Sequence, residues 1–288
     1  MIIIKLWGGL GNQLFQYAFG YALAKDRNQE LCIDTSFYDN QPGNVGKRNV
    51  NLNQLNIPPY KNFGGNFVFK ILNNRYMGFI TRNLPKCSLY VSKGLKYFKE
   101  PIHKYVHKIP NGKNLYFDGY WQSSKYFLKY KSELQNMFVP QKPIPQDVLE
   151  TESVIESVNS VCVHMRKGDF GKGKLRKVGH LLSEDYYKKA VAYCKEKLAE
   201  PVFFVFTDDE EWASFVLGDC NNIKFINDMC QSDALTDLYL MTKCKNGIMS
   251  ASTFSWWGNW LRKEKGLVVV PNGQYYNEFF YEDEWVRL

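Results

Sequence analysis

The chain has 288 residues, of which 45% are apolar and 23% are charged, so disorder, collagen and coiled coil are excluded as descriptions of the whole chain. Its length allows about two domains, and its seven cysteines form no C-x-x-C pair, so we expect reduced thiols without a zinc site or disulfides. The net charge is +8, no apolar run approaches the roughly 20 residues of a membrane-spanning helix, and residues 2–4 are too short for a signal-peptide core. We therefore expect a soluble, cytoplasmic protein.

A strand, a glycine-rich turn and a helix are predicted at the start of the chain. Residues 2–6 are apolar, three glycines follow within residues 8–11, and the apolar spacing beyond them is typical of a helix with Asn12 at its cap. The glycine spacing is not G-x-G-x-x-G, so it indicates a dinucleotide site only weakly. The next strand is expected at residues 31–34.

Residues 40–115 show weak periodicity and many Gly, Asn, Pro and Lys residues, so we expect irregular structure with short helices, followed by a strand at 114–120. Within this region, residues 61–113 hold 11 basic residues and one acid. Such a stretch is either a solvated face or a surface that attracts an anionic substrate or an anionic membrane, for instance in loose attachment to the inner membrane face. No nucleic-acid signature accompanies it, so we expect no nucleic-acid partner.

Three prolines within residues 139–145 mark a linker, and we expect a boundary there between a domain at 1–145 and a domain at 146–288. Beyond it, apolar strands alternate with helices, which is typical of a parallel sheet covered on both faces. The strands are expected at 160–164, 202–206, 223–226, 247–251 and 267–270, and the helices at 183–199, at 233–244 and through 257–261.

In such sheets ligands bind beyond the carboxyl ends of the strands, so the side chains that follow each strand are candidates for one common crevice. These side chains are polar in four junctions. Besides the glycine turn, they are His164, Arg166, Lys167, Asp208, Asp209 and residues 252–255.

Each candidate also has a structural interpretation. Arg166 is suited to bidentate phosphate binding, or it forms a surface ion pair. The hydroxyls of 252–255 precede a helix and suit a phosphate, or they simply cap that helix. His164 stacks on or bonds to a ligand, or it is a buried structural histidine. For residues 208–209 we prefer a helix N-terminus to a metal site.

Residues 168–174 read G-x-x-x-x-G-K, the pattern of a phosphate-binding loop. Leu175 follows where Ser or Thr would hold magnesium, so the pattern indicates a P-loop only weakly. A P-loop kinase or sulfotransferase would depend on these residues.

Taken together, five segments resemble the family 11 glycosyltransferases, the α-1,2-fucosyltransferases, in their bacterial form. They follow the family's order and span nearly the whole chain. They are GGLGNQLFQYA at 8–18, GYWQSSKYF at 119–127, HMRKGDF at 164–170, FTDD at 206–209 and STFSWWGNWL at 252–261.

The resemblance implies an α/β fold of GT-B type, in which two Rossmann-like domains face each other across a cleft. The first would bind much of the acceptor and the second GDP-β-L-fucose. The implied reaction is the inverting transfer of fucose to the 2-hydroxyl of a terminal galactoside in surface-glycan (lipopolysaccharide O-antigen) synthesis, without a metal or another cofactor.

The resemblance also implies roles for individual residues. Arg166 would bind the donor diphosphate, His164 would lie near the guanosine, Asp237 would contact the guanine, and Asn12 would reach the reacting centre. Further donor-binding residues would be Gly9, Gly11, Gln13, Lys167, Ser252, Thr253, Phe254 and Ser255.

Three substitutions depart from the family pattern, and one of them, Thr207 in place of a serine, is conservative. Lys167 stands in place of an arginine, which keeps the charge but loses the planar fork, and Phe170 stands in place of a tyrosine. Asp169 is a candidate general base, or it only orients Arg166. A module that binds a GDP-sugar or a glycan without turnover stays open as an alternative to the enzyme.

Overall fold

The computed structural model describes residues 1–39, 41, 47–64, 89–92, 94–101, 104–167, 181–218, 220–273 and 276–288. The chain forms two compact units. The first consists of Met1–Phe138 and Tyr276–Phe280, and the second consists of Val139–Tyr275 and Tyr281–Leu288. The sequence analysis places the boundary after residue 145 and does not foresee that residues 276–280 belong to the first unit. The acceptor and donor roles of the two units stay predictions.

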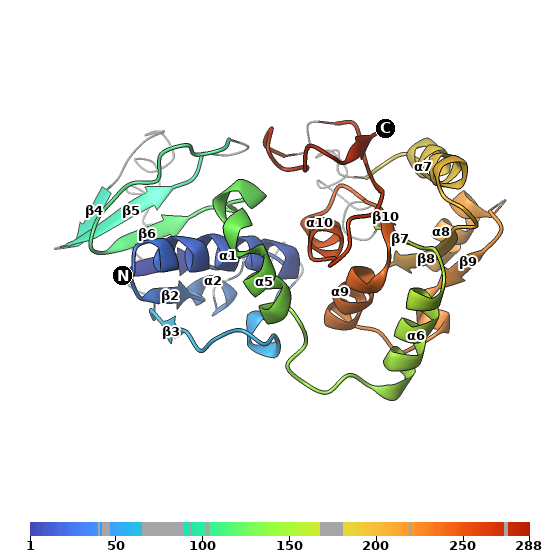
Figure 1. Cartoon of the computed structure of the whole chain (residues 1–288). Helices are drawn as coiled ribbons and strands as arrows, with labels where there is room; N and C mark the ends of the chain where they lie inside the picture. The colour runs from blue at the N-terminus through green and yellow to red at the C-terminus, as the bar shows by residue number, and fades with distance from the viewer. Residues whose placement is uncertain are drawn as a thin grey trace. The chain divides into compact units, whose positions relative to one another are not determined.

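The first unit is built on a six-stranded sheet in the order β3-β2-β1-β6-β5-β4 (Figure 1). Neighbouring strands are parallel except β4 and β5. The chain order reverses between β1 and β6, which makes their carboxyl ends a topological switch point. The strands are β1 (Ile2–Lys5), β2 (Leu31–Asp34), β3 (Lys61–Asn62), β4 (Leu89–Ser92), β5 (Leu95–Lys99) and β6 (Leu115–Asp118).

Helix α1 (Leu10–Asp26) follows β1 and is buried along most of its length, because its sequence is largely apolar and aromatic. Phe19 of α1 stacks on Trp121 with 4.0 Å between the ring centroids. Phe280, from the C-terminal segment, lies against Phe15 of α1 at 6.0 Å. The shorter helices of this unit are α2 (Ser36–Asp39), α5 (Lys131–Met137) and the 3-10 turns η1 (Leu52–Gln54), η2 (Ser124–Tyr126) and η3 (Leu128–Tyr130).

The structure confirms the strands predicted at 2–6, 31–34 and 114–120 as β1, β2 and β6. Residues 40–115 differ from the expectation of short helices. Their described part contains one 3-10 turn, η1, and three strands, β3, β4 and β5. These strands are short, and β3 and β4 lie at the two edges of the sheet, where the apolar pattern of a buried strand is not required.

The second unit is built on a six-stranded sheet in the order β12-β11-β10-β7-β8-β9, with every neighbouring pair parallel. This is the strand order of a doubly wound nucleotide-binding sheet, and its switch point lies between β7 and β10. The strands are β7 (Ser160–Met165), β8 (Val202–Thr207), β9 (Ile223–Phe225), β10 (Asn246–Ile248), β11 (Val268–Val270) and β12 (Val286–Arg287).

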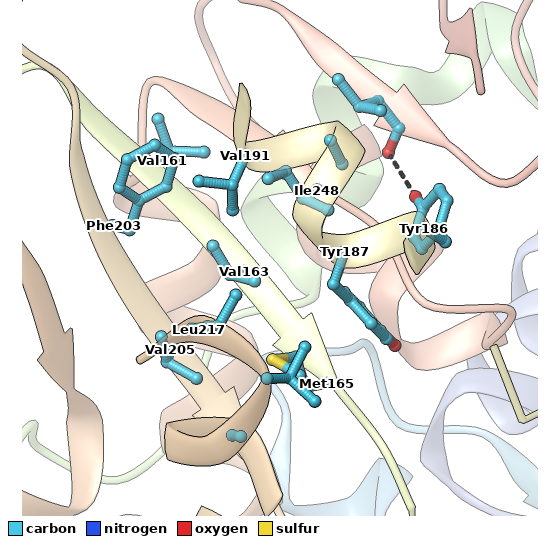
Figure 2. Close-up of a cluster of buried hydrophobic side chains, with 14 of the residues drawn as sticks. Val161, Val163, Met165, Tyr186, Tyr187, Val191, Phe203, Val205, Leu217 and Ile248 are labelled. Carbon is cyan, nitrogen blue, oxygen red and sulfur yellow. Dashed lines mark hydrogen bonds between the residues drawn. The ribbon is translucent and has the colours of Figure 1, made fainter. Parts of the chain in front are cut away.

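A cluster of buried apolar side chains joins this sheet to the helices that cover one face of it (Figure 2). Val161 and Val163 of β7 and Phe203 of β8 pack there with Tyr187 and Val191 of α7. The helices are α6 (Gln146–Ser157), α7 (Glu184–Lys197), α8 (Glu210–Leu217), α9 (Ala234–Lys243), α10 (Thr253–Trp260) and the 3-10 turn η6 (Ile226–Asp228). Among the described residues, no helix is both long and apolar enough to cross a membrane.

The alternation of strands and helices predicted for residues 146–288 is confirmed. Ser183 caps α7 as expected, because its side chain accepts a hydrogen bond from the backbone N–H of Tyr186. The expectation for the strand at 247–251 is wrong at its end, since β10 stops at Ile248. Helix α6 and the two-residue strand β12 were not predicted, and of α8 only the start at residues 208–209 was.

Candidate active site

The switch point of the second unit holds a buried histidine–serine pair. His164, the fifth residue of β7, lies 2.6 Å through its Nδ1 from the Oγ of Ser250, which follows β10. Burial lowers the pKa of His164 to about 3, and the nearby positive charge of Arg166 adds to this effect. The imidazole is therefore neutral at physiological pH, with one donor and one acceptor nitrogen. The Nδ1 nitrogen contacts Ser250, so Nε2 is the ring nitrogen with which His164 can donate to or accept from a ligand.

Two cations follow β7 and meet two carboxylates that follow β8. The Nε of Arg166 lies 4.0 Å from the Oδ2 of Asp208, and the side chains are 28% and 39% exposed. This distance allows attraction but not a hydrogen bond between these atoms. Lys167 is held more firmly, because its backbone N–H donates to Asp208 Oδ1 at 2.8 Å and its Nζ lies 2.9 Å from Asp209 Oδ2.

Asp209 has the structural role that the sequence favours for residues 208–209. It is the N-cap of α8, where its Oδ1 accepts a 2.9 Å hydrogen bond from the backbone N–H of Trp212. The contact with Lys167 lowers the pKa of Asp209, and the bond from Trp212 lowers it further. Asp209 therefore stays ionised, stabilises the start of α8 and fixes Lys167 beside it.

The hydroxyl-rich junction at 252–255 has two half-buried residues between two buried ones. Ser252 is the N-cap of α10 and accepts a 3.2 Å bond from the backbone N–H of Phe254. Thr253 and Phe254 are half-buried, and the ring of Phe254 lies 5.5 Å from that of His164. Ser255 is fully buried, and its Oγ has no hydrogen-bond partner among the described residues. A direct contact between Ser255 and the donor, which the resemblance implies, is thus not favoured by its position.

Asp237 lies on the first turn of α9, whose N-cap is Asp233. Burial raises the pKa of Asp237 to about 6, and the neighbouring charge of Asp233 adds to the rise. A hydrogen bond from the Ser232 side chain opposes this rise, so burial outweighs the one side-chain donor that acts on the Asp237 carboxyl.

The glycine turn, residues 8–11, leads from β1 into α1 in the first unit. Gly8 has a φ of +83°, a left-handed conformation that other residues adopt only with strain. Gly9 is the N-cap of α1, where no side chain caps the helix and no acid occupies its first turn. This helix start therefore carries an uncompensated positive dipole end, which suits an anion.

The side chains of Asn12 and Gln13 make different contacts. Asn12 is the third residue of α1 rather than its cap, so the predicted capping role is wrong. Its Oδ1 accepts a 3.0 Å hydrogen bond from Gln122 Nε2. Gln13 is fully buried, donates to the carbonyls of Gly8 and Asn49, and accepts from the backbone N–H of Asn51. Gln13 therefore has a structural role instead of the expected donor contact, and Gly11 is likewise buried.

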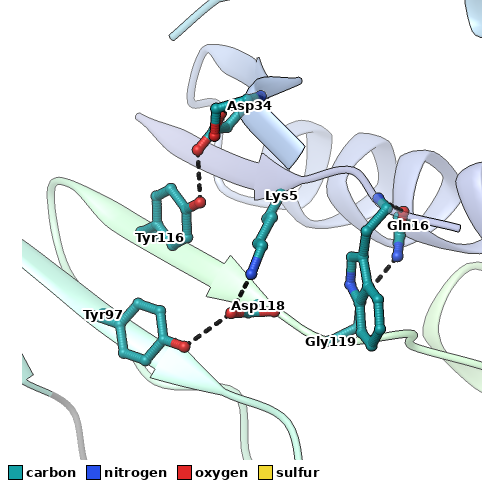
Figure 3. Close-up of polar contacts among 9 residues, drawn as sticks. Lys5, Gln16, Asp34, Tyr97, Tyr116, Asp118 and Gly119 are labelled. Carbon is teal, nitrogen blue, oxygen red and sulfur yellow. Dashed lines mark hydrogen bonds and ion pairs between the residues drawn. The ribbon is translucent and has the colours of Figure 1, made fainter. Parts of the chain in front are cut away.

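A polar network occupies the carboxyl edge of the first sheet (Figure 3). Lys5 Nζ lies 2.9 Å from Asp118 Oδ2, which also accepts a bond from the Tyr97 hydroxyl at 2.9 Å. The Tyr116 hydroxyl donates to Asp34 Oδ2 at 2.6 Å. These side chains come from four neighbouring strands, so the network holds the edge of the sheet together beside the glycine turn.

Glu100 holds the loop at residues 119–122, which follows β6. Its Oε2 accepts hydrogen bonds from the backbone N–H groups of Tyr120 at 2.6 Å and Trp121 at 2.8 Å. Burial raises the pKa of Glu100 to about 7, against the opposing effect of the two bonds. Gln16 Nε2 and Trp7 Nε1 both donate to the carbonyl of Gly119. Since Gln16 belongs to the motif at residues 8–18 and Gly119 to the motif at residues 119–127, these two motifs contact each other at the switch point of this sheet.

Some of the predicted residues lie outside the described part of the chain. They include Asp169, Phe170 and the rest of the P-loop-like residues 168–174. The structure therefore does not test the general-base hypothesis for Asp169 or the phosphate-loop hypothesis. The sequence analysis counts Ser250 among the polar residues after the strands but gives it no role, and it missed Gln122, Glu100 and Asn277 as candidates. Gln122 stands within a motif that was noted, whereas nothing in the sequence around Glu100 or Asn277 signals a role.

The described residues contain no group of three or more His, Cys, Asp or Glu side chains that could hold a metal ion. Within the second unit the structure brings together His164, Phe254 and Ser250, and it places Arg166 and Lys167 against residues 208–209. Asn12, Gly9, Gly11 and Gln13 belong to the first unit.

Comparisons with known proteins identify the family. The model of glycosyl transferase family 11 matches residues 81–288. An α-1,2-colitosyltransferase of Escherichia coli is 33% identical over 303 residues, which cover 100% of this chain and 99% of the relative. The O-antigen biosynthesis glycosyltransferase WbnK of Escherichia coli is 30% identical and covers 98% and 99%.

A solved structure shares the fold. Arabidopsis thaliana FUT1, a variant in complex with GDP, has a TM-score of 0.53 at 13% identity, with 95% of this chain and 71% of that chain covered. This likeness supports the GT-B-type fold predicted from the sequence and carries no information on substrate. The two α/β units with polar residues at both switch points fit this fold, and the family model and the relatives match most or all of the chain. The protein therefore belongs to glycosyl transferase family 11 and is a glycosyltransferase.

Proposed function

We propose that the protein is a galactoside 2-α-L-fucosyltransferase, which transfers L-fucose from GDP-β-L-fucose to the 2-hydroxyl of a terminal galactoside with inversion and without a metal. The observation that carries the proposal is the group of side chains at the β7–β10 switch point. The neutral imidazole of His164 is paired there with Ser250 and lies 5.5 Å from the ring of Phe254 in the first turn of α10, and the positive charge of Arg166 acts on the same imidazole.

Each group has a task in this reaction. Cleavage of the donor develops negative charge on the β-phosphate of GDP, and without a metal this charge needs fixed cations and dipoles. Arg166 supplies a permanent cation at the end of β7, and the start of α10, beside His164, supplies a capped turn of hydroxyl residues. A charge-assisted hydrogen bond contributes about 1.5–3 kcal/mol, so a few such contacts stabilise the leaving group substantially.

The guanine is assigned to Asp237. An ionised carboxylate accepts the two N–H donors on the Watson–Crick edge of guanine, which adenine lacks in that arrangement. Burial keeps the pKa of Asp237 raised to about 6 despite the hydrogen bond from Ser232, so N–H donors of a ligand would stabilise its ionised form further.

The acceptor hydroxyl must lose a proton as the new bond forms. Asp169 is one candidate for the base. The alternative is a loose, oxocarbenium-like transition state that needs only weak base assistance, with Asp169 orienting Arg166.

The test is an assay with purified protein, GDP-fucose and a panel of galactosides, read by GDP release and by NMR of the product. We expect acceptor-dependent GDP release that persists in EDTA, and an α-1,2 linkage. Tight binding of GDP-fucose without any release would instead indicate a binding module, and a requirement for magnesium and ATP would indicate the P-loop alternative.

A second candidate donor is GDP-colitose, because the E. coli relative at 33% identity is named an α-1,2-colitosyltransferase. Colitose is the 3-deoxy counterpart of L-fucose, so the two donors differ by one hydroxyl. A site that hydrogen-bonds this hydroxyl rejects the deoxy sugar by a factor of about 10⁴, whereas a site without such a bond discriminates weakly. The ratio of kcat/KM for the two donors therefore decides between them.

We further propose that the enzyme acts in the cytoplasm at the inner membrane face, where lipid-linked acceptors for O-antigen would be assembled. The proposal is supported by the O-antigen relative WbnK and by the basic character of residues 61–113. Sedimentation with anionic and neutral vesicles at low salt tests it, and equal binding to both would contradict the membrane contact.

A further inference from the structure

Ser250 contributes a buried hydroxyl to the β7–β10 switch point of the second unit. The residue is 3% exposed, and its Oγ lies 2.6 Å from the Nδ1 of His164. This Oγ has no second hydrogen-bond partner among the described residues. Because a hydroxyl has one hydrogen to donate, the direction of this single bond decides whether that hydrogen is paired.

The surroundings of the pair favour the Ser250 hydroxyl as the donor. If the Nδ1–H of His164 donated instead, the hydroxyl hydrogen would be buried without an acceptor, and a buried unpaired donor costs free energy. The distance favours the same direction, because hydroxyl donors form shorter hydrogen bonds than N–H donors, whose bonds start at about 2.7 Å. A neutral imidazole that accepts at Nδ1 carries its hydrogen on Nε2.

The ring of His164 lies on the face of the second sheet that α9 and α10 cover. Side chains alternate along β7, so His164 shares this face with Cys162, which packs in one cluster with Leu240 of α9 and Phe254 of α10. The ring of Phe254 lies 5.5 Å from that of His164. Nε2 has no hydrogen-bond partner among the described residues, so it is available at the edge of the sheet where doubly wound folds bind ligands.

From these contacts we propose that Ser250 is a positioning residue that holds the proton of His164 on Nε2, so that the ring offers an N–H donor to an oxygen of the ligand bound at this switch point. The position of the proton follows from contacts within the second unit and does not depend on the proposed function. The choice of GDP as the ligand rests on that function. Without the hydroxyl the ring could also carry its proton on Nδ1, and Nε2 would then present a lone pair that repels a phosphate or carbonyl oxygen.

The first test locates the proton by NMR of protein that carries isotope-labelled histidine. The chain has four histidines, whose ring signals are assigned through their side-chain carbons. In the wild-type protein without ligand we expect His164 to show a hydrogen bonded to Nε2 and an unprotonated Nδ1. A hydrogen on Nδ1 would overturn the inference, and this measurement needs no variant.

Two variants then show whether Ser250 is the cause. Ser250→Ala removes the hydroxyl, so the His164 signals should move toward a mixture of the two tautomers. The matched control is Ser160→Ala, which should leave these signals unchanged. Ser160 is likewise buried, but it lies at the opposite end of β7, where its Oγ accepts a 3.1 Å hydrogen bond from the backbone N–H of Lys245. Unchanged His164 signals in Ser250→Ala would contradict the positioning role.

The second test compares dissociation constants for GDP by calorimetry. Ser250→Ala should weaken GDP binding at least about threefold, which is within the contribution of one hydrogen bond, and Ser160→Ala should change it less than twofold. On a His164→Phe background, which keeps a ring without nitrogens, Ser250→Ala should change it less than twofold. Unchanged affinity in Ser250→Ala, or equal weakening on both backgrounds, would overturn the role toward the ligand.

The two tests separate this inference from the proposed function. If the wild-type protein does not bind GDP, the proposed function fails, and the NMR spectra of the wild type and of Ser250→Ala still decide whether Ser250 holds the proton of His164 on Nε2.

Discussion

Arg166 and Lys167, the two cationic residues that follow β7, contact different carboxylates through their side chains. Lys167 is committed to an ion pair with Asp209 at the start of α8, whereas the Arg166 Nε lies 4.0 Å from Asp208, beyond hydrogen-bond distance. A planar guanidinium also grips a diphosphate bidentately, which an ammonium does not. In the proposed function, donor activation therefore depends more on Arg166 than on Lys167.

Arg166→Ala is expected to lower kcat/KM at least about 100-fold, or about 2.7 kcal/mol in the transition state. Lys167→Ala should lower it less, because Lys167 is held by Asp209. Lys189→Ala is a suitable control, since Lys189 forms an exposed pair with Asp185 on α7. Steady-state kinetics on folded proteins measure the difference, and near-normal turnover by Arg166→Ala would refute the role.

Asp237 makes the binding of GDP depend on pH. Its pKa is raised to about 6, and only the ionised form accepts the guanine N–H groups, so affinity is present above pH 6 and is lost as the pH falls through that value. Between pH 7 and pH 5 the dissociation constant should rise about tenfold. Calorimetric titration of wild type and Asp237→Asn checks this. The variant should bind weakly with no such slope; if both proteins show the same slope, another group is responsible.

At the scale of elements, the starts of the helices differ in how they are capped. Helices α7, α8, α9 and α10 each begin with a side-chain cap, from Ser183, Asp209, Asp233 and Ser252. Helix α1 begins at Gly9 without a side-chain cap and without an acid in its first turn. The positive dipole end of α1 is therefore not balanced by a side chain of its own first turn, which suits an anionic partner.

Gly8 and Gly9 provide a matched pair of substitutions. Gly8→Ala should destabilise the protein by about 1–3 kcal/mol, because φ is +83° and the new Cβ would meet Asn12 Nδ2. Gly9→Ala should change stability by less than about 0.5 kcal/mol, because its φ is −82° and no atom lies within 4 Å of the new Cβ. Urea unfolding measures both. Loss of transfer by a stable Gly9→Ala protein would support close approach of the donor to this backbone.

At the scale of the whole molecule, the chain leaves the second unit to contribute Tyr276–Phe280 to the first and then returns. Phe280 lies against Phe15 of α1, and Phe279 lies beneath the Lys125 ammonium, 3.4 Å from its ring centroid. The stability of the first unit therefore depends on residues near the end of the chain.

Phe280→Ala should cost about 3–5 kcal/mol, as expected for a buried aromatic side chain. The loss should appear as faster hydrogen exchange in α1, which Phe280 contacts, rather than in β7 and β8. Leu288→Ala, at an exposed position, serves as the control. Unchanged exchange in α1 would show that the C-terminal segment does not stabilise the first unit.

The parts of the fold that the sequence predicts are those with strong local signals. Two α/β units were predicted from the apolar strands β7 and β8 and the capped helix α7. The family was predicted from the order of the motifs. The edge strands β3 and β12, two residues each, have too little pattern to be recognised. The assignment of residues 276–280 to the first unit depends on tertiary packing of Phe280 and Asn277, which no local pattern encodes.

The candidate site, too, could be predicted only in part. Motifs in the sequence point to Arg166, His164 and Asp237, but they do not show which residues each of these side chains contacts. Gln13 and Ser255 stand in motif positions and are buried in the structure, because a motif records both ligand contacts and the packing that supports them. Ser250 and Gln122 emerge only from contacts between distant segments.

The path of the chain also sets an order of events during biosynthesis. A ribosome releases α1 and the first sheet early, yet Phe280 joins them only after the whole of Val139–Tyr275 has been translated. At about 5–20 residues per second this interval is on the order of ten seconds. Throughout it, the nascent N-terminal half exposes the apolar surface of α1 that Phe280 later covers, which makes this surface a target for chaperones that bind apolar segments.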